Sequence, residues 1–371
     1  YSLGGITLLC RFDGQRVTMA SQMSEADETV SSLYSVKSEQ ATMLSFDTYN
    51  YLVHYFGQPQ GSMADDPNGT LGGDYEFVIS DATADRIELK GKKYGNRIVM
   101  KAFSADQTWK QYLTRIKKVE DDAFFYEYDL RMDGLYTGQM LRSNYTFIVT
   151  YYDEVGKVHQ KTVPFMFTTD GMRFHEPVTI DGQTMQNFVW KNEEISFVCT
   201  DEGATEVKMK GIYIDGYQSY DYYPGTYLMD FYRLNGATNQ LEVASQEIQL
   251  VKNEDGKSYW LKGLEYDILV TYDKPRGGLS ILPQFLKKVQ GGYVYLAMWD
   301  LMNDYVLRSS AIGLISYPTT DGIYLVDNGV WMGEISGFIF GVYNSQDEEA
   351  SFMGYTDAVA AIRLVKKTIE E

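Results

Sequence analysis

Residues 73–80 read Gly-Asp-Tyr-Glu-Phe-Val-Ile-Ser, and after a turn residues 86–93 read Arg-Ile-Glu-Leu-Lys-Gly-Lys-Lys. A second turn leads to residues 97–103, Arg-Ile-Val-Met-Lys-Ala-Phe. Apolar and polar residues alternate within each run, and Gly, Asp and Asn lie between the runs. Such alternation is typical of half-buried antiparallel strands that follow one another in a meander.

The same pattern returns near residues 257–286, where further runs of alternating residues are separated by short turns. These runs are Ser-Tyr-Trp-Leu-Lys-Gly-Leu at 258–264, Asp-Ile-Leu-Val-Thr-Tyr-Asp at 267–273 and Leu-Ser-Ile-Leu-Pro-Gln-Phe at 279–285. Two meanders in a chain of 371 residues indicate two closed or nearly closed β-units, because the chain is too long for one small core. The sequence therefore predicts an all-β fold with two antiparallel, barrel-like domains.

A polar stretch at residues 200–205 is the expected boundary, so the predicted domains are residues 1–205 and 206–371. The first is expected to be a meander. The second is expected to hold about eight to ten strands in an up-and-down barrel. Its last strand is expected to pair with its first, because this pairing removes the open edges of the sheet.

One short helix is predicted near residues 105–118. Its apolar side chains fall on one helical face, and they are Trp109, Tyr112, Leu113 and Ile116. Ser104 or Asp106 can cap its N-terminus.

The composition narrows the class of partner. The formal net charge is −18, which argues against nucleic acid and against an anionic bilayer, because both are bound by clustered Lys and Arg. No apolar run of about 18 residues is present, so no transmembrane helix is predicted. Residues 6–12 already read as a strand, and we expect the natural N-terminus, with any targeting signal, to lie upstream.

The two cysteines, Cys10 and Cys199, do not form a disulfide scaffold. Two buried free thiols are favoured, because unpaired Cys is commonly buried. A bridge is the alternative, and it requires that the first and last strands of the first domain be neighbours.

No catalytic motif, nucleotide-binding fingerprint or zinc-binding spacing is present, so no catalytic residue, cofactor or metal is expected. The three histidines, His54, His159 and His175, show no ligand spacing. Asp65, Asp66, Asn68 and Asp74 gather oxygen donors of the kind that calcium prefers, and they are weak calcium candidates. Their Asp-Pro-Asn-Gly sequence is also an ordinary β-turn, and the turn is favoured.

A segment rich in tyrosine at residues 212–227 is the strongest candidate for binding. Exposed rings can stack on sugars or contact a protein partner, since Tyr is enriched at interfaces. We favour a structural interpretation, in which several of these rings cover the mouth or floor of the second barrel. The candidate residues for ligand or partner binding are Tyr213, Tyr217, Tyr220, Tyr222 and Tyr223.

Several segments of the first half resemble a domain-of-unknown-function family of surface lipoproteins from Bacteroidota. The segments are residues 4–21, residues 44–50 with His54-Tyr55-Phe56, and Gly-Gly-Asp-Tyr-Glu-Phe with Leu-Lys-Gly-Lys-Lys within 72–93. In the second half, Gly-Thr-Tyr-Leu-Met-Asp-Phe-Tyr at 225–232 and Tyr-Trp-Leu-Lys-Gly-Leu at 259–264 are similar to lipocalin-like modules of such proteins.

The resemblance implies a secreted protein that a lipidated cysteine, absent from this chain, anchors to the outer membrane at the cell surface. It also implies an accessory role beside SusC/SusD-type systems for nutrient uptake. The implied partners are a TonB-dependent transporter and a SusD-like lipoprotein, and the implied ligand is a peptide or a glycan. We therefore expect a non-catalytic binding protein. The alternatives are a surface hydrolase of glycans or peptides and a carrier of a small apolar ligand inside a barrel.

Overall fold

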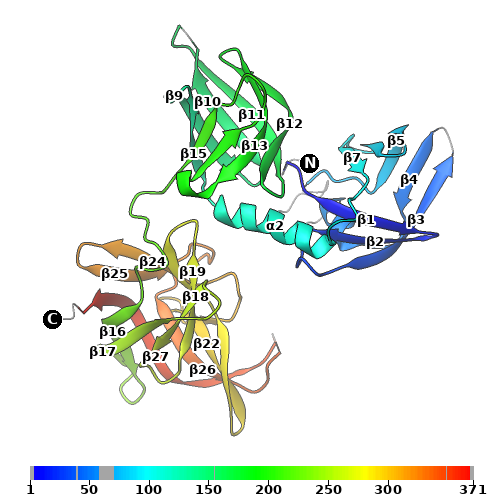
Figure 1. The fold of residues 1–371 in the computed structure, drawn as a ribbon. Coiled ribbons are helices and arrows are strands. Elements are labelled where there is room, and N and C mark those ends of the chain that lie inside the picture. The colour runs from blue at the N-terminus through cyan, green and yellow to red at the C-terminus, as the bar shows by residue number, and fades with distance from the viewer. Residues whose placement is uncertain (1–3, 39–40, 58–70, 154, 348, 368–371) are drawn as a thin grey trace. The chain divides into compact units, whose positions relative to one another are not determined.

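The computed structural model describes the chain except for residues 1–3, 39–40, 58–70, 154, 348 and 368–371 (Figure 1). The chain divides into two compact units, residues 1–213 and 214–371. Nearly all regular structure in the described residues is β, and the predicted all-β class is confirmed.

The first unit begins with a curled sheet of seven antiparallel strands, each paired with the next along the chain. These are β1 (Leu8–Asp13), β2 (Arg16–Ser21), β3 (Val30–Ser38), β4 (Thr42–Phe46), β5 (Glu76–Ala82), β6 (Arg86–Gly91) and β7 (Arg97–Lys101). The last three are the strands predicted between residues 73 and 103. Their apolar positions meet those of β2 and β4 in one buried cluster, together with the short helix α1 (Tyr51–His54). A 3-10 turn, Tyr55–Gly57, follows α1.

The predicted helix is present as α2 (Trp109–Asp122), but its cap is neither Ser104 nor Asp106. Thr108 caps it, because a Gln three residues later completes a reciprocal capping box. The Gln111 N–H donates to the Thr108 hydroxyl at 3.2 Å, and the Thr108 N–H donates to the Gln111 side-chain oxygen at 2.9 Å. One face of α2 is buried through Leu113, Ile116 and Val119.

A closed barrel of eight antiparallel strands completes the first unit. Its strands are β8 (Glu127–Met132), β9 (Leu135–Ser143), β10 (Thr146–Tyr152), β11 (Val158–Phe167), β12 (Gly171–Ile180), β13 (Gln183–Lys191), β14 (Ser196–Cys199) and β15 (Lys208–Ile212), with a 3-10 turn at Asn192–Glu194. β15 pairs with β8 and closes the ring. The first unit therefore continues through β15, past the polar stretch at residues 200–205.

The second unit contains a further closed barrel, with a sheet extension joined to it. The barrel strands are β16 (Gly225–Asn235), β17 (Gln240–Lys252), β18 (Ser258–Lys262), β19 (Ile268–Asp273), β20 (Gly278–Ile281), β24 (Leu314–Thr319), β25 (Gly322–Asp327) and β27 (Phe352–Lys366). As predicted, the last strand pairs with the first. The extension consists of β26 (Gly337–Tyr343), β22 (Gly292–Asp300), β21 (Gln284–Val289) and β23 (Tyr305–Leu307), and the long strand β27 belongs to both parts.

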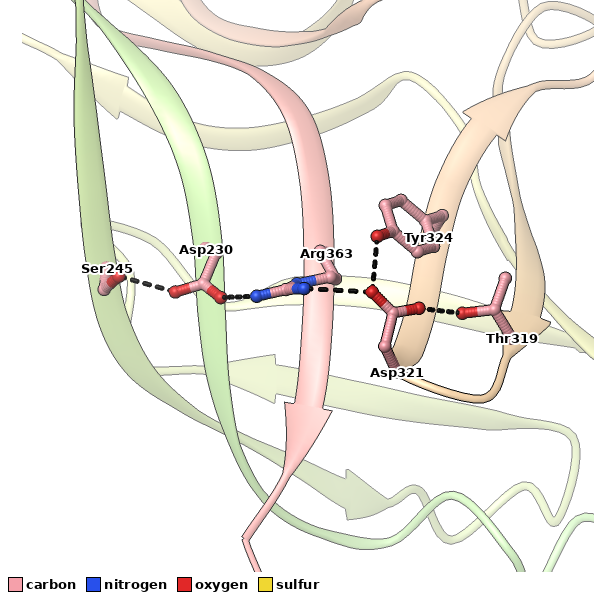
Figure 2. A network of polar contacts seen from close by, with 6 residues as sticks. All are labelled: Asp230, Ser245, Thr319, Asp321, Tyr324 and Arg363. Carbon is pink, nitrogen blue, oxygen red and sulfur yellow. Dashed lines mark hydrogen bonds and ion pairs between the residues drawn. The ribbon is translucent and has the colours of Figure 1, made fainter.

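A polar network crosses the seam where β27 meets β16 and β25. Figure 2 shows its members, Asp230, Ser245, Thr319, Asp321, Tyr324 and Arg363. The Arg363 guanidinium donates to Asp230 at 2.8 Å and to Asp321 at 3.1 Å. Because exposed ion pairs contribute little free energy, this network serves mainly to fix the side chains along the seam.

Candidate binding surface

Both barrel interiors are filled by side chains of their own strands. In the first, rings such as Tyr128, Phe147, Phe165 and Phe197 are fully buried within one cluster. In the second, Tyr, Met, Leu and Ile side chains form a comparable cluster. Small barrels are usually filled in this way. These packed interiors argue against the alternative of an apolar ligand carried inside a barrel.

Three of the five predicted tyrosines help to build a plug within the second unit. The tyrosine plug consists of Tyr217, Tyr220, Tyr223, Tyr259 and Tyr272. The Tyr220 and Tyr259 rings stack with centroids 4.7 Å apart. The Tyr220 hydroxyl donates to the Ser258 carbonyl, Tyr259 to the Tyr220 carbonyl and Tyr223 to the Gly277 carbonyl, at 2.7–2.8 Å. These hydroxyls are engaged within the fold, and the rings of Tyr220, Tyr223, Tyr259 and Tyr272 belong to the core cluster of the second unit.

The other two predicted residues lie elsewhere. Tyr213 belongs to the first unit, where its ring contacts Phe125 edge-on with centroids 5.0 Å apart. Tyr222 is exposed beside the plug, and the Lys366 ammonium lies 5.1 Å from its ring centroid. Tyr213 therefore belongs to a different unit from the other four tyrosines, of which three lie in the plug.

Burial raises the pKa of Tyr259 and Tyr272 above the usual phenol value of about 10. Above that pH the unfolded chain loses phenol protons that the folded chain retains, so stability is present in full below about pH 10 and falls as the pH rises further. We expect the urea midpoint of the second unit to decrease as the pH is raised from 9 to 11. In Tyr259→Phe this decrease of the midpoint with pH should be smaller. A midpoint independent of pH across this range would contradict the buried phenols.

Asp74 is the only calcium candidate within the described residues, since Asp65, Asp66 and Asn68 lie outside them. It is buried, and its carboxylate accepts hydrogen bonds from the loop between β6 and β7. The N–H groups of Lys93 and Tyr94 donate at 2.7 and 3.0 Å, and the Asn96 amide donates at 2.6 Å. The carboxylate therefore anchors this loop.

The cysteines lie in different sheets, Cys10 in β1 and Cys199 in β14, and both are free thiols. The first and last strands of the first unit are not neighbours, so the condition for a bridge is not met. Burial raises the pKa of the Cys10 thiol to about 12 and that of Cys199 to about 11. These thiols are therefore neutral and weakly reactive at ordinary pH.

The three histidines lie in α1, β11 and β12. Within the described ranges, no three potential ligands among His, Cys, Asp and Glu come together as a metal site requires. Among the helices that the structure describes, none has both the length and the apolar character of a membrane-spanning segment.

A row of aromatic rings with exposed ends lies on the sheet extension of the second unit, and it was not predicted from the sequence. Four rings from four neighbouring strands, which we call the aromatic row, follow one another across one face: Phe285, Tyr295, Tyr343 and Phe352. Successive centroids are 5.4, 5.7 and 5.5 Å apart.

Strand register explains why the row forms. Tyr295 lies directly opposite both Phe285 and Gly341, and Tyr343 lies directly opposite Phe352. A side chain at Gly341 would meet the rings of Tyr343 and Phe352 at 2.9 and 3.1 Å, so the glycine lets these rings lie against the sheet. Alternate residues of the same strands, such as Leu296, face the barrel core.

The row has exposed ends and a buried middle. Phe285 and Phe352 are each 44% exposed, whereas Tyr343 is almost fully buried. The Arg308 guanidinium lies 4.8 Å from the Tyr295 centroid and 4.3 Å from that of Tyr343, within the range of a cation–π contact. Burial raises the pKa of Tyr343, and the positive charge of Arg308 opposes this shift. The Tyr343 hydroxyl has no hydrogen-bond partner among the described residues.

One sequence signal could have indicated the row. Tyr293 and Tyr295 occupy alternate positions of a strand whose other positions are aliphatic, so aromatic side chains stand where polar outward residues are ordinarily found. Such a pattern predicts an apolar outer face. It cannot predict which other strands supply the neighbouring rings.

Comparison with domain families finds two matches. Residues 1–192 match a domain of unknown function, DUF4302, and residues 200–340 match a second domain of unknown function, DUF4987. No curated protein and no solved structure matches the chain.

Proposed function

The chain belongs to the DUF4302 family, whose model matches residues 1–192, and from this premise we propose that it is a non-catalytic cell-surface lipoprotein. Its role is that of an accessory binding component of an outer-membrane SusC/SusD-type uptake system. The proposed partners are a TonB-dependent transporter and a SusD-like lipoprotein, and the ligand is a glycan or a peptide.

The aromatic row is the observation that best supports a binding role. Large aromatic groups are mostly buried in soluble proteins, and a contiguous exposed apolar patch commonly marks an interaction site. The row places rings at the separation of neighbouring strands, about 5 Å. The glycan packs the apolar faces of its sugars on the exposed end rings, Phe285 and Phe352, while the Arg308 guanidinium lies over the two middle rings.

We expect the double variant Phe285→Ala and Tyr295→Ala to lose ligand affinity by about 10- to 30-fold, because truncation of central aromatic anchors costs about 1.4–2 kcal/mol. Isothermal titration with ligands found by screening panels of oligosaccharides and short peptides gives the measurement. Tyr317→Ala is the matched control, because Tyr317 is an exposed tyrosine at 61% on β24, outside the row. Equal loss in the double variant and the control would contradict binding at the row.

The uptake role has its own test. The tagged full-length protein is isolated from gently solubilised outer membranes, and the proteins that accompany it are identified. Recovery of a transporter and a SusD-like lipoprotein in stoichiometric amounts is the expected result. Recovery of the protein alone, with no binding to either panel, would overturn the proposal, and turnover of a panel member would indicate the hydrolase instead.

A further inference from the structure

The outer wall of the first barrel carries a hollow of about 590 Å³ that is separate from the aromatic row. We call it the basic hollow. Its lining residues are Arg131, Glu193, Glu194, Ile195, Ser196, Lys208, Lys210 and Tyr213. They come from β8, β14, β15, the turn before β14 and Tyr213, the residue that follows β15, all within the first unit.

Two like charges face each other directly in this hollow. Arg131 on β8 lies opposite Lys208 on β15 in the ladder that closes the barrel. Like charges at directly opposed positions destabilise a sheet. Asp129 lies 2.8 Å from the Arg131 guanidinium, and Glu194 lies 2.8 Å from the Lys208 ammonium, which offsets part of this repulsion.

Two donors of the hollow are not taken up by these pairs. Lys210 is exposed and forms no ion pair within the part of the chain that the structure describes. The Nε–H of Arg131 is buried and has no acceptor among the described residues. Arg131, Lys208 and Lys210 thus place three cationic side chains in one hollow. The whole chain, by contrast, has a net charge of −18.

The turn beside these cations is strained. Ile195 has φ 46° and ψ 43°, the left-handed conformation. This conformation is a genuine outlier for a β-branched residue and is energetically unfavourable. Backbone strain of this kind clusters at binding sites. Here the strained residue lines the hollow and directly follows Glu194, the partner of Lys208.

We propose that the basic hollow binds the carboxylate of an acidic glycan, such as one that contains uronic acid. Lys210 and the exposed part of the Arg131 guanidinium donate charge-assisted hydrogen bonds to this carboxylate. The ring of Tyr213, which is 45% exposed, offers an apolar face to the sugar. Glu193 accepts hydrogen bonds from sugar hydroxyls. The ligand class rests on the proposed function, whereas the site does not depend on the aromatic row.

The test is calorimetric titration of the full chain at low ionic strength with a trimer of galacturonic acid, its methyl ester and tri-glutamate. We expect the acid to bind at least about tenfold more tightly than the other two, because a tenfold difference corresponds to about one charge-assisted hydrogen bond. Lys210→Glu is expected to lose at least about tenfold in affinity for the acid, and Lys210→Gln is expected to lose less.

Lys101→Glu is the matched control, because it makes the same change of charge on an exposed strand of the seven-stranded sheet. Lys101→Glu is expected to retain binding of the acid. The double variant Phe285→Ala and Tyr295→Ala is expected to retain it too, and this result would separate the basic hollow from the binding role proposed for the aromatic row. Thermal melting confirms that each variant is folded. Lack of binding by the acid, equal binding by the ester or by tri-glutamate, or equal loss in Lys101→Glu would each overturn the proposal.

Discussion

Replacement of Tyr259 by alanine is expected to lower the free energy of unfolding of the second unit by about 3–5 kcal/mol, as for other large buried aromatic residues. Tyr259 is fully buried at the centre of the tyrosine plug. Its ring stacks on Tyr220, and it also contacts Tyr223 and Tyr272. The substitution leaves a cavity among these rings, and it removes the hydrogen bond to the Tyr220 carbonyl.

Urea unfolding of the full chain, with hydrogen exchange to assign the loss to residues 214–367, measures this effect. Tyr259→Phe keeps the ring and is expected to cost only about 1 kcal/mol, the usual value of one hydrogen bond. Tyr232→Ala is the surface control, since Tyr232 is 44% exposed on β16, and a change within about 0.5 kcal/mol is expected. If Tyr259→Ala were as mild as Tyr232→Ala, the plug would not support the barrel.

The second large effect is expected from Asp74→Ala in the seven-stranded sheet, which should lower the free energy of unfolding by about 3 kcal/mol. Hydrogen bonds to a charged group contribute about 1.5–3 kcal/mol each, and in the variant water can replace some of the hydrogen bonds that the exposed loop loses. Gly91→Ala is expected to cause a similar loss, because a Cβ at Gly91 would lie 1.9 Å from the Asp74 carboxylate. We call the contact between Asp74 and Gly91 the interlock. Because the two residues touch, the double variant should lose less stability than the sum of the losses of the single variants.

Urea unfolding of the four chains of this cycle measures the coupling. Asp85→Ala is the matched control, because Asp85 is an exposed aspartate between β5 and β6, and it is expected to change stability by less than about 0.5 kcal/mol. Because the Asp74 carboxylate is already occupied by N–H donors, calcium or a chelator is expected to leave the midpoint unchanged. Additive losses, or a rise in the midpoint with calcium, would contradict the interlock.

The interlock also gives a physical reason for part of the family resemblance. The segments Gly-Gly-Asp-Tyr-Glu-Phe and Leu-Lys-Gly-Lys-Lys are separate in sequence, but Asp74 of the first lies against Gly91 of the second. The glycine before Asp74 is close-packed too, since the Gly73 N–H donates to the Phe56 carbonyl at 2.7 Å. These motif residues hold the seven-stranded sheet together.

Local patterns in the sequence predicted the strands between residues 73 and 103, the helix over residues 105–118 and the pairing of the last strand with the first. Strand alternation and helical spacing are properties of a few neighbouring residues, so they can be read without knowledge of the fold. The exact cap of α2 was missed, although Thr108 and Gln111 carry its signature, because Ser104 and Asp106 are equally good capping residues.

Residue patterns along the chain were enough to predict the all-β class, the meanders and the family of this protein. The tertiary structure alone decided that Tyr213 joins the first barrel while Tyr220 and Tyr223 enter a plug in the second unit. It alone assembled the aromatic row, which joins a pair of rings from β21 and β22 to a pair from β26 and β27, and it alone set Arg131 opposite Lys208. The reason is that strand register and barrel closure are long-range choices, and a shift of one residue would turn each of these side chains to the other face of its sheet.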